Sequence, residues 1–482
     1  MPFSARRRLA GAIFTTLILV GLVDRTDAAC DPGSANPGPL GLIDHFVIIY
    51  QENWSFDGLY GLMEGAEGIE QAAKSGAIRQ TDRNGNPLTT LPTPSTDPEV
   101  PAGLPVQPFD LSRFVTANER TGDIVHRFYT EQLQIGNGLL EPGTGRNEKF
   151  VTWSNNGSLV MSYYDARSLP MGRWAKEYTL ADHFFHAAYG GSFLNHQFLI
   201  AAAAPVWRQA VPARAGFVSR WDAASGRLID GHLTFDGRFV VNTTFPAQGP
   251  HPKRIPPNQL LKAINDSDPK KPDYTPTIGD RLDDKGISWR WYSGAWNAAL
   301  DRHETREFQY HHQPFAYFSR YAPFDSAGRL RPNTTGPLAH LQDETQFLAD
   351  LGAKRLPAVS FIKPIGTENE HPGYANLLAG QRHVDGILEA IRKSPYWDRT
   401  AVIVTYDENG GRWDHVPPPH RDEWGPGTRV PTLILSPKAR AHHIDHTVYD
   451  TLSILKTLEV RFNLKPLNER DGAANSLVCA FQ

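Results

Sequence analysis

Acidic and amide side chains follow two separate apolar runs of this 482-residue chain. They are Glu52 and Asn53 after the run 45–50, and Asp407 and Glu408 after the run 401–406. Ligands of open α/β sheets bind beyond the carboxyl ends of the strands, so we expect these side chains at one sheet edge. Carboxylates held together raise one another's pKa unless a cation neutralises them. The pattern indicates a cation site, although a single acidic pair after a strand is more often a solvated loop.

An oxygen-only set of ligands suits a hard divalent cation. We therefore expect one divalent metal ion, with Ca²⁺ favoured over Mg²⁺. Zn²⁺ and iron fit less well, because the expected set contains no histidine or cysteine.

A serine follows two glycines at the start of a long apolar stretch. The segment is Tyr189-Gly190-Gly191-Ser192, and residues 193–201 continue it with a helical pattern. Ser192 is therefore expected at a helix N-terminus, where free amides and the helix dipole favour anions such as phosphate. A serine oxygen close to a metal ion would be a competent nucleophile. The competing interpretation is an ordinary helix-capping serine.

Four histidines stand in polar, aromatic-rich segments of the chain. They are His126, His311, His312 and His371. An imidazolium titrates near pH 6.5, so a histidine cluster would bind phosphate best in mild acid, and one member could protonate a leaving alkoxide. The sequence spacing does not show that the four converge, and each alone is more often structural.

The elements that must position these residues are short apolar strands alternating with amphipathic helices. The expected strands are 45–50, 357–362, 401–406 and 431–435. A helix over 377–394 buries Val384, Ile387, Leu388 and Ile391, and a helix over 447–462 buries Val448, Leu452, Leu455 and Leu458 and starts near His446 or Thr447. This alternation predicts an α/β fold with a central, mostly parallel sheet and helices on both faces.

Two stretches, 64–120 and 207–300, are polar and rich in proline and turn residues. They read as insertions into a single catalytic domain, residues 29–482, and we expect them to form the rim of a site. The chain is 40% hydrophobic and 21% charged, with a formal net charge of -3. This composition is that of a globular protein and argues against nucleic-acid binding, which usually requires a basic excess.

The first 28 residues have the pattern of a signal peptide. Arg6, Arg7 and Arg8 precede an uncharged stretch over 9–23, and small residues allow cleavage after Ala28. We therefore expect a secreted or periplasmic protein without a stable membrane span; an uncleaved anchor is the alternative. The two cysteines, Cys30 and Cys479, could pair in an oxidising compartment or stay as free thiols.

Several long segments, in order, resemble a known family. Ile43–Gly61 (IDHFVIIYQENWSFDGLYG) and Thr405–Pro419 (TYDENGGRWDHVPPP) are similar to the first and last signatures of the bacterial phosphoesterase family. That family holds acid phosphatases and phosphatidylcholine-type phospholipases C. Segments between and after these signatures, including LADHFFHAAYGGSFLNHQFLIAA and FIKPIGTENEHPGY, resemble family segments as well.

The resemblance implies an alkaline-phosphatase-like fold with one metal ion. By similarity the metal ligands are Glu52, Asn53, Ser192, Asp407 and Glu408, and Ser192 is also the nucleophile. By the same similarity His126, His311, His312 and His371 line the phosphate pocket. Ser55 is the competing serine, which we interpret as a helix cap, and Asp414 and His415 are expected to support the ligands.

The branch of the family decides the expected activity. The segments around His126 and over 365–374 look more like the phosphatase branch, so we expect an acid phosphatase acting on small phosphate monoesters through a phosphoserine. The alternatives are a phospholipase C that cleaves the phosphodiester of a lipid head group, and a non-catalytic metal-binding surface protein. The sequence leaves the physiological substrate, the pH optimum and the oligomeric state open.

Overall fold

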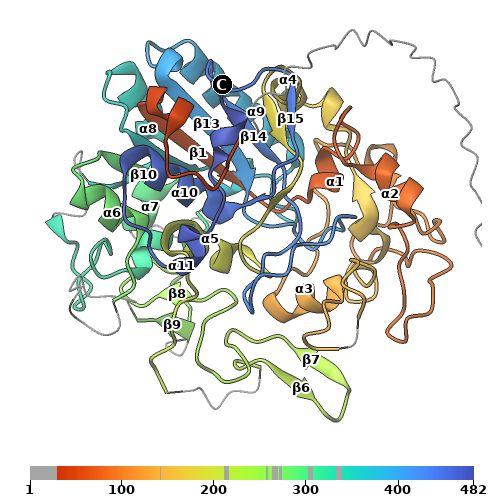
Figure 1. Cartoon of the computed structure of the whole chain (residues 1–482). Helices are drawn as coiled ribbons and strands as arrows, with labels where there is room; N and C mark the ends of the chain where they lie inside the picture. The colour runs from red at the N-terminus through yellow and green to blue at the C-terminus, as the bar shows by residue number, and fades with distance from the viewer. Residues whose placement is uncertain are drawn as a thin grey trace, which may run out of the picture.

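The computed structural model describes residues 30–141, 143–210, 216–256, 259–262, 270, 274–301, 308–332 and 339–482. Within these residues an eight-stranded sheet has the order β11-β10-β12-β1-β13-β14-β4-β15 (Figure 1). Its strands are β1 (His45–Gln51), β4 (Thr179–Ala181), β10 (Trp289–Ser293), β11 (Leu341–Asp343), β12 (Val359–Lys363), β13 (Thr400–Tyr406), β14 (Thr432–Leu435) and β15 (His443–Asp445). All neighbouring strands are parallel except at β14, which runs antiparallel to both β13 and β4.

Helices and short strand pairs surround this sheet. The helices are α1 (Phe56–Leu59), α2 (Ile69–Ser75), α3 (Phe128–Ile135), α4 (Pro170–Glu177), α5 (Ser192–Ala201), α6 (Ile278–Asp284), α7 (Trp296–Leu300), α8 (Thr345–Gly352), α9 (Leu377–Arg392), α10 (Thr451–Phe462) and α11 (Glu469–Gly472). The short pairs are β2 (Phe109–Asp110) with β3 (Ser162–Tyr163), β5 (Phe184–Phe185) with β16 (Tyr449–Asp450), β6 (Arg220–Asp222) with β7 (Arg227–Ile229), and β8 (Phe245–Pro246) with β9 (Leu260–Leu261).

The side chains of β1 alternate between two helical layers. Phe46 packs its ring against Phe462 of α10, and Tyr50 packs against His196 of α5. Gln51 points the other way and donates to Glu370, which also accepts a hydrogen bond from Gln381 of α9. Because successive residues of a strand face opposite sides, α5 and α10 cover one face of the sheet and α9 covers the other. The α/β class, with a mostly parallel sheet and helices on both faces, is confirmed.

The expected strands 45–50, 357–362, 401–406 and 431–435 correspond to β1, β12, β13 and β14. The second expected helix starts later than predicted. Its N-cap is Asp450, whose carboxylate accepts from the Leu452 amide, because Tyr449 and Asp450 first pair as β16 with β5. Val448 therefore precedes the helix and is 44% exposed, which corrects its assignment to the buried face.

The stretch expected as a second insertion, 207–300, also contributes to the central sheet. Its β10 lies between β11 and β12, whereas the hairpin β6–β7 lies at the lower edge of Figure 1, away from the sheet. The partition into one domain with two insertions stays a prediction. No helix among the described residues is both long and apolar enough to span a membrane. The expected signal peptide, residues 1–28, lies outside the described residues.

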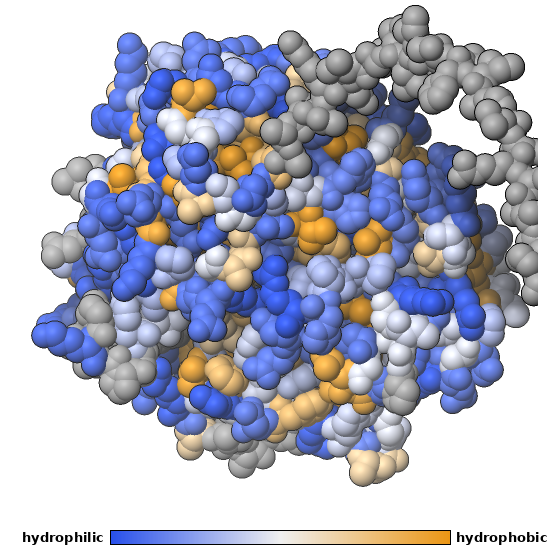
Figure 2. Space-filling view, viewed as in Figure 1, coloured by the Kyte–Doolittle hydropathy of each residue, from blue (hydrophilic) through white to orange (hydrophobic). Residues whose placement is uncertain are grey.

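The two ends of the described chain are tied together. Cys30 and Cys479 form a disulfide with their Cα atoms 5.5 Å apart, within the usual range for such a bridge. This settles the choice between pairing and free thiols in favour of pairing. The molecular face in Figure 2 is mostly hydrophilic, with apolar side chains scattered singly or in small groups, as expected for an ordinary protein surface.

Candidate active site

The two acidic segments meet because β1 and β13 are neighbours. The strands are parallel with Gln51 opposite Tyr406, so the next residues, Glu52 and Asp407, leave the sheet side by side. The backbone N–H of Asn53 donates to Asp407 Oδ1 at 3.2 Å, and the backbone N–H of Glu408 donates to the same oxygen at 2.8 Å. The backbone itself therefore holds both segments at the carboxyl edge of the sheet.

Oxygen atoms converge where the two segments meet. The side-chain amide oxygen of Asn53 lies 2.8 Å from Glu408 Oε1, 3.0 Å from Glu52 Oε2 and 3.3 Å from Asp407 Oδ1. A reversed amide would instead donate its NH₂ to these three carboxylates. With the NH₂ inward, the amide oxygen also accepts from His371 Nε2 at 2.9 Å, so every atom of the amide is satisfied; with the oxygen inward, a cation is needed between the four oxygens.

The pKa values of the buried acids also indicate a site for a cation. Burial, and then the charge of Glu52, raises the pKa of Asp407 to about 7. Burial and the charge of Asp407 raise the pKa of Glu408 well above its usual value. Asp407 Oδ2 also lacks a hydrogen-bond partner among the described residues. Fully buried, underused carboxylate oxygens are the donors that a hard divalent cation binds, so this set fits the expected metal.

Ser192 lies beside the acids. It is the first residue of α5, and its Oγ donates to Glu52 Oε2 at 3.0 Å and lies 3.5 Å from Glu408 Oε1. The structure therefore brings Ser192 and the acidic segments together, and their roles stay a prediction. Ser55, the competing serine, caps α1 instead: its Oγ accepts from the Gly58 amide and donates to the Trp413 carbonyl.

The turn before Ser192 requires its two glycines. Gly190 has φ +84°, and a Cβ there would lie 2.4 Å from the Phe128 nitrogen. A Cβ at Gly191 would lie 2.9 Å from the His126 carbonyl oxygen. The turn is also fixed by buried Glu131, which accepts hydrogen bonds from the Gly190 amide and from the His186 ring. The segment carrying His126 and the segment carrying Ser192 are thus packed backbone against backbone.

A cavity of about 390 Å³ opens over Ser192. Its lining includes Ser192, His126, His311 and His371. His126 Nε2 lies 3.6 Å from Glu408 Oε1, and the rings of His126 and His371 lie 5.7 Å apart. Three of the four expected histidines therefore face one space beside the serine.

The fourth expected histidine takes another place. His312 Nε2 lies 3.1 Å from Glu52 Oε1, and the ring stacks on His196 at 4.8 Å. It therefore contacts an expected metal ligand, whereas the adjacent His311 contributes to the cavity lining.

Burial changes the expected charge of the histidines. It lowers the pKa of His311 to about 3 and that of His371 to about 4. The sequence suggested imidazolium groups in mild acid, but in the free site these two rings are neutral there. A phosphate dianion entering the cavity would favour the protonated rings and raise both pKa values.

Two buried residues of the site escaped the sequence analysis. Lys363, at the end of β12, forms an ion pair with Glu52 Oε1. His196, one helical turn after Ser192, places Nδ1 2.7 Å from the Ser192 carbonyl oxygen. Each carried a signal: a lysine ending an apolar strand, and a histidine four positions after the serine, on the same face of the helix.

The residues expected to support the ligands make their contacts elsewhere in the structure. Asp414 and His415 belong to a buried cluster around Arg429: the Arg429 Nε donates to Asp414 Oδ1 at 2.8 Å, and His415 Nδ1 lies 2.6 Å from Asp57 Oδ2. Among the described contacts the cluster joins the Asp414 segment to α1.

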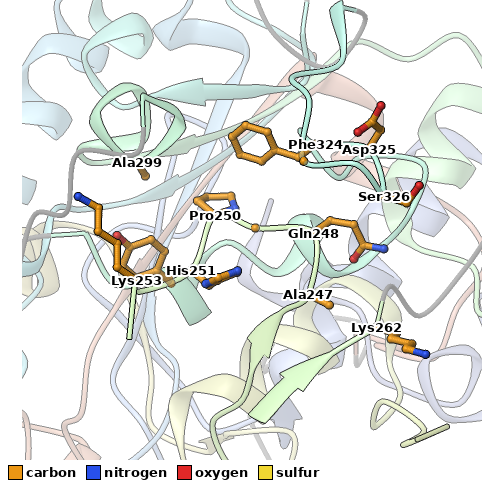
Figure 3. Close-up of a pocket in the computed structure, with 13 residues that line it drawn as sticks. Ala247, Gln248, Pro250, His251, Lys253, Lys262, Ala299, Phe324, Asp325 and Ser326 are labelled. Carbon is orange, nitrogen blue, oxygen red and sulfur yellow. The ribbon is translucent and has the colours of Figure 1, made fainter. Parts of the chain in front are cut away.

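A second cavity, of about 730 Å³, lies elsewhere (Figure 3). Its lining includes Gln248, His251, Lys253, Lys262 and Phe324. None of Glu52, Asp407 and Glu408 lines this larger cavity, so its size alone does not make it the reaction site.

Comparisons with known proteins identify the family of this chain. The model described as "Phosphoesterase family" matches residues 43–465, and the chain belongs to that family. It is 25% identical to phospholipase C B of Mycobacterium tuberculosis over 476 residues, which cover 92% of this chain and 78% of that protein. It is 24% identical to non-hemolytic phospholipase C of Pseudomonas aeruginosa, covering 96% of this chain and 60% of that one.

Solved structures are more distant. A phosphonate monoester hydrolase of Agrobacterium radiobacter aligns with a TM-score of 0.35 and 11% identity, covering 91% of this chain and 77% of that chain. A protein of the alkaline phosphatase superfamily from Vibrio parahaemolyticus aligns with a TM-score of 0.25 and 18% identity, covering 41% and 49%. The α/β class of this chain therefore rests on its own sheet topology.

Proposed function

We propose that this member of the phosphoesterase family hydrolyses phosphoesters with Ser192 as the nucleophile. The observation that carries the proposal is the placement of the Ser192 hydroxyl 3.0 Å from Glu52 and at the mouth of a histidine-lined cavity. Glu52, Asn53, Asp407 and Glu408, together with Ser192 itself, would hold one divalent cation, with Ca²⁺ favoured. That cation would neutralise the acids and withdraw charge from the phosphate.

The chain's own groups suit an in-line displacement. Ser192 Oγ attacks the phosphorus atom as its proton passes to Glu52, to which it already donates. The new bond joins Oγ to phosphorus, and the bond from phosphorus to the leaving oxygen breaks. Water then attacks the phosphorylated serine, so that phosphate or a phosphate monoester leaves and Ser192 regains its proton. Positioning and charge stabilisation would supply most of the acceleration.

The histidines would complete the phosphate site. His126, His311 and His371 line the space above Ser192, where their ring nitrogens can face the phosphate oxygens. A ring that takes up a proton as phosphate binds can return it to the leaving alkoxide. His312, held against Glu52, would orient that carboxylate.

The substrate class has two candidates. The relatives named phospholipase C align over nearly the whole chain and favour a phosphodiester substrate of the phospholipid type. The acid phosphatase predicted from the sequence is the second candidate, favoured by the modest 390 Å³ cavity over Ser192. We take phosphodiester cleavage as the first candidate, because the alignments with those relatives cover most of this chain and most of each relative.

The test compares substrates and a variant. Phosphatidylcholine and a chromogenic phosphate monoester are assayed in turn with Ca²⁺, Mg²⁺ or Zn²⁺, from acid to alkaline pH. Faster turnover of the lipid supports the first candidate, and faster turnover of the monoester supports the second. Ser192→Ala should reduce both activities by about 10³-fold or more, whereas Ser55→Ala should retain them. Full activity in Ser192→Ala would eliminate the mechanism.

A further inference from the structure

Another group of side chains that could hold a metal ion lies at the same sheet edge, at the ends of β4 and β15. β4 and β15 are parallel, with Ala181 opposite Asp445. The residues that follow these strands, Asp182 and His446, therefore emerge side by side. His183 comes next in the chain, and one donor atom of each of the three residues lies within 4.8 Å of the others.

The distances within this group are short. His183 Nδ1 lies 2.8 Å from Asp182 Oδ1. His446 Nδ1 lies 3.0 Å and 2.9 Å from the two oxygens of Asp182. Asp182 is fully buried, whereas the His446 side chain is 60% exposed. Two imidazole nitrogens and a carboxylate thus meet beside a largely exposed histidine.

The hydrogen-bonding capacity of His183 does not match its neighbours. Its Nδ1 faces Asp182, and its Nε2 lies 3.2 Å from Glu67 Oε2. A neutral imidazole has one N–H donor and one lone pair, so it cannot donate to both carboxylates; an imidazolium, or a metal ion in place of one proton, satisfies both. A metal ion on Nδ1 removes this conflict, because Nε2–H can then donate to Glu67. A carboxylate on the distal nitrogen is how proteins commonly orient a metal-bound histidine.

The surroundings hold the group in place. The Glu67 amide donates to Asp182 Oδ2 at 2.8 Å. Buried Arg429 donates to the carbonyl oxygens of Glu67 and of Asp182, so the two segments are fixed to one another. A site formed before binding loses little conformational entropy when an ion enters.

We propose that Asp182, His183 and His446 form a second metal site that binds Zn²⁺, with Glu67 orienting His183. Two histidine nitrogens and a carboxylate, with a fourth position left to water, suit zinc better than calcium or magnesium. The site differs in chemistry from the oxygen-only set around Asp407. It does not depend on the function proposed for Ser192.

Zinc uptake tests the proposal. Chelator-treated full-length protein is dialysed against Zn²⁺ in an excess of Ca²⁺, which is favoured at the oxygen-only set, and its zinc content is measured by mass spectrometry. Wild type should bind one more zinc ion per chain than His446→Gln. Glu67→Gln should weaken the affinity about 10–100-fold. The matched control His420→Gln removes another exposed histidine and should bind as wild type does.

A second readout identifies the ligands. Co²⁺ bound to histidine nitrogens absorbs visible light, so with Ca²⁺ in excess the band should be stronger in wild type and in His420→Gln than in His446→Gln. Added Zn²⁺ should raise the melting temperature of wild type and leave that of His446→Gln unchanged. Equal zinc content and equal cobalt spectra in wild type and His446→Gln would overturn the proposal, whatever the result of the activity assays.

Discussion

Ser192 Oγ lies 3.0 Å from Glu52 Oε2, although 140 residues separate them in the sequence. Glu52 lies at the sheet edge because it follows β1, which is buried between β12 and β13. Ser192 reaches Glu52 from the first turn of α5. The proposed chemistry depends on this contact, so changes that disturb either partner should affect activity before they affect the fold.

Lys363→Met should destabilise the metal-free protein by about 3 kcal/mol, because it leaves the fully buried Glu52 without its cationic partner. The loss should be smaller with a bound divalent cation, which supplies the missing charge. Urea unfolding with and without Ca²⁺ measures both values. Arg329→Met, which breaks an exposed pair with Asp325, should cost less than about 1 kcal/mol in either condition. An equal loss with and without cation would argue against metal binding at Glu52.

Gly190→Ala should impair activity through the backbone. Gly190 and Gly76 both have positive φ, but a Cβ at Gly76 meets nothing within 4 Å. Gly76→Ala should therefore cost only about 1–2 kcal/mol of left-handed strain. Gly190→Ala adds a clash with the Phe128 backbone, and a shift of Ser192 by about 1 Å should lower turnover about 10²-fold. Thermal melts and kinetics of the two variants, compared side by side, test the difference.

Glu408→Gln should have opposite effects on stability and on metal binding. Burial and the charge of Asp407 raise the pKa of Glu408, so the ionised carboxylate is unfavourable without a cation. The variant should melt at a higher temperature than wild type after chelation, yet bind Ca²⁺ more weakly and lose activity. Glu99→Gln, at an exposed acid, should change neither property. A Glu408→Gln protein with unchanged Ca²⁺ affinity would remove Glu408 from the ligand set.

Glu459, which is not one of the site residues, should make the free energy of unfolding depend on pH. Burial, and then the neighbouring Asp471 carboxyl group, raises the pKa of Glu459 to about 9. The folded chain thus keeps a proton that the unfolded chain releases above about pH 4.5. Stability should therefore fall by up to about 1.4 kcal/mol per pH unit as the pH rises towards 9.

Glu459→Gln should remove that slope and become more stable than wild type as the pH rises. Denaturant unfolding at several pH values measures the difference. Glu469→Gln, at an exposed carboxylate, should keep the wild-type slope. Parallel curves for wild type and Glu459→Gln would show that Glu459 titrates normally.

The sequence predicted the parts of the fold whose signal is local. β1 and β13 are continuous apolar runs, and their parallel pairing brings Glu52 to Asp407 as the strand-end argument required. The resemblance to a family supplied the long-range link to Ser192, which no local pattern contains. Three-residue strands such as β4 and β15 were missed because so short a run resembles a loop.

Other features depended on tertiary context. The start of α10 at Thr451 follows from the pairing of β16 with β5, a strand far away in the chain. The neutral state of His311 and His371 follows from burial, which spacing does not reveal. Lys363 became a site residue only because β12 lies next to β1.

A trapping experiment tests the central claim most directly. Enzyme is mixed with a substrate that carries labelled phosphorus and quenched in acid within one turnover, and the labelled peptide is sequenced. The label should be found on Ser192, whether the substrate is a monoester or a phosphodiester labelled at phosphorus, and should be absent from Ser192→Ala. Label on another residue, or full turnover by Ser192→Ala, would contradict the account.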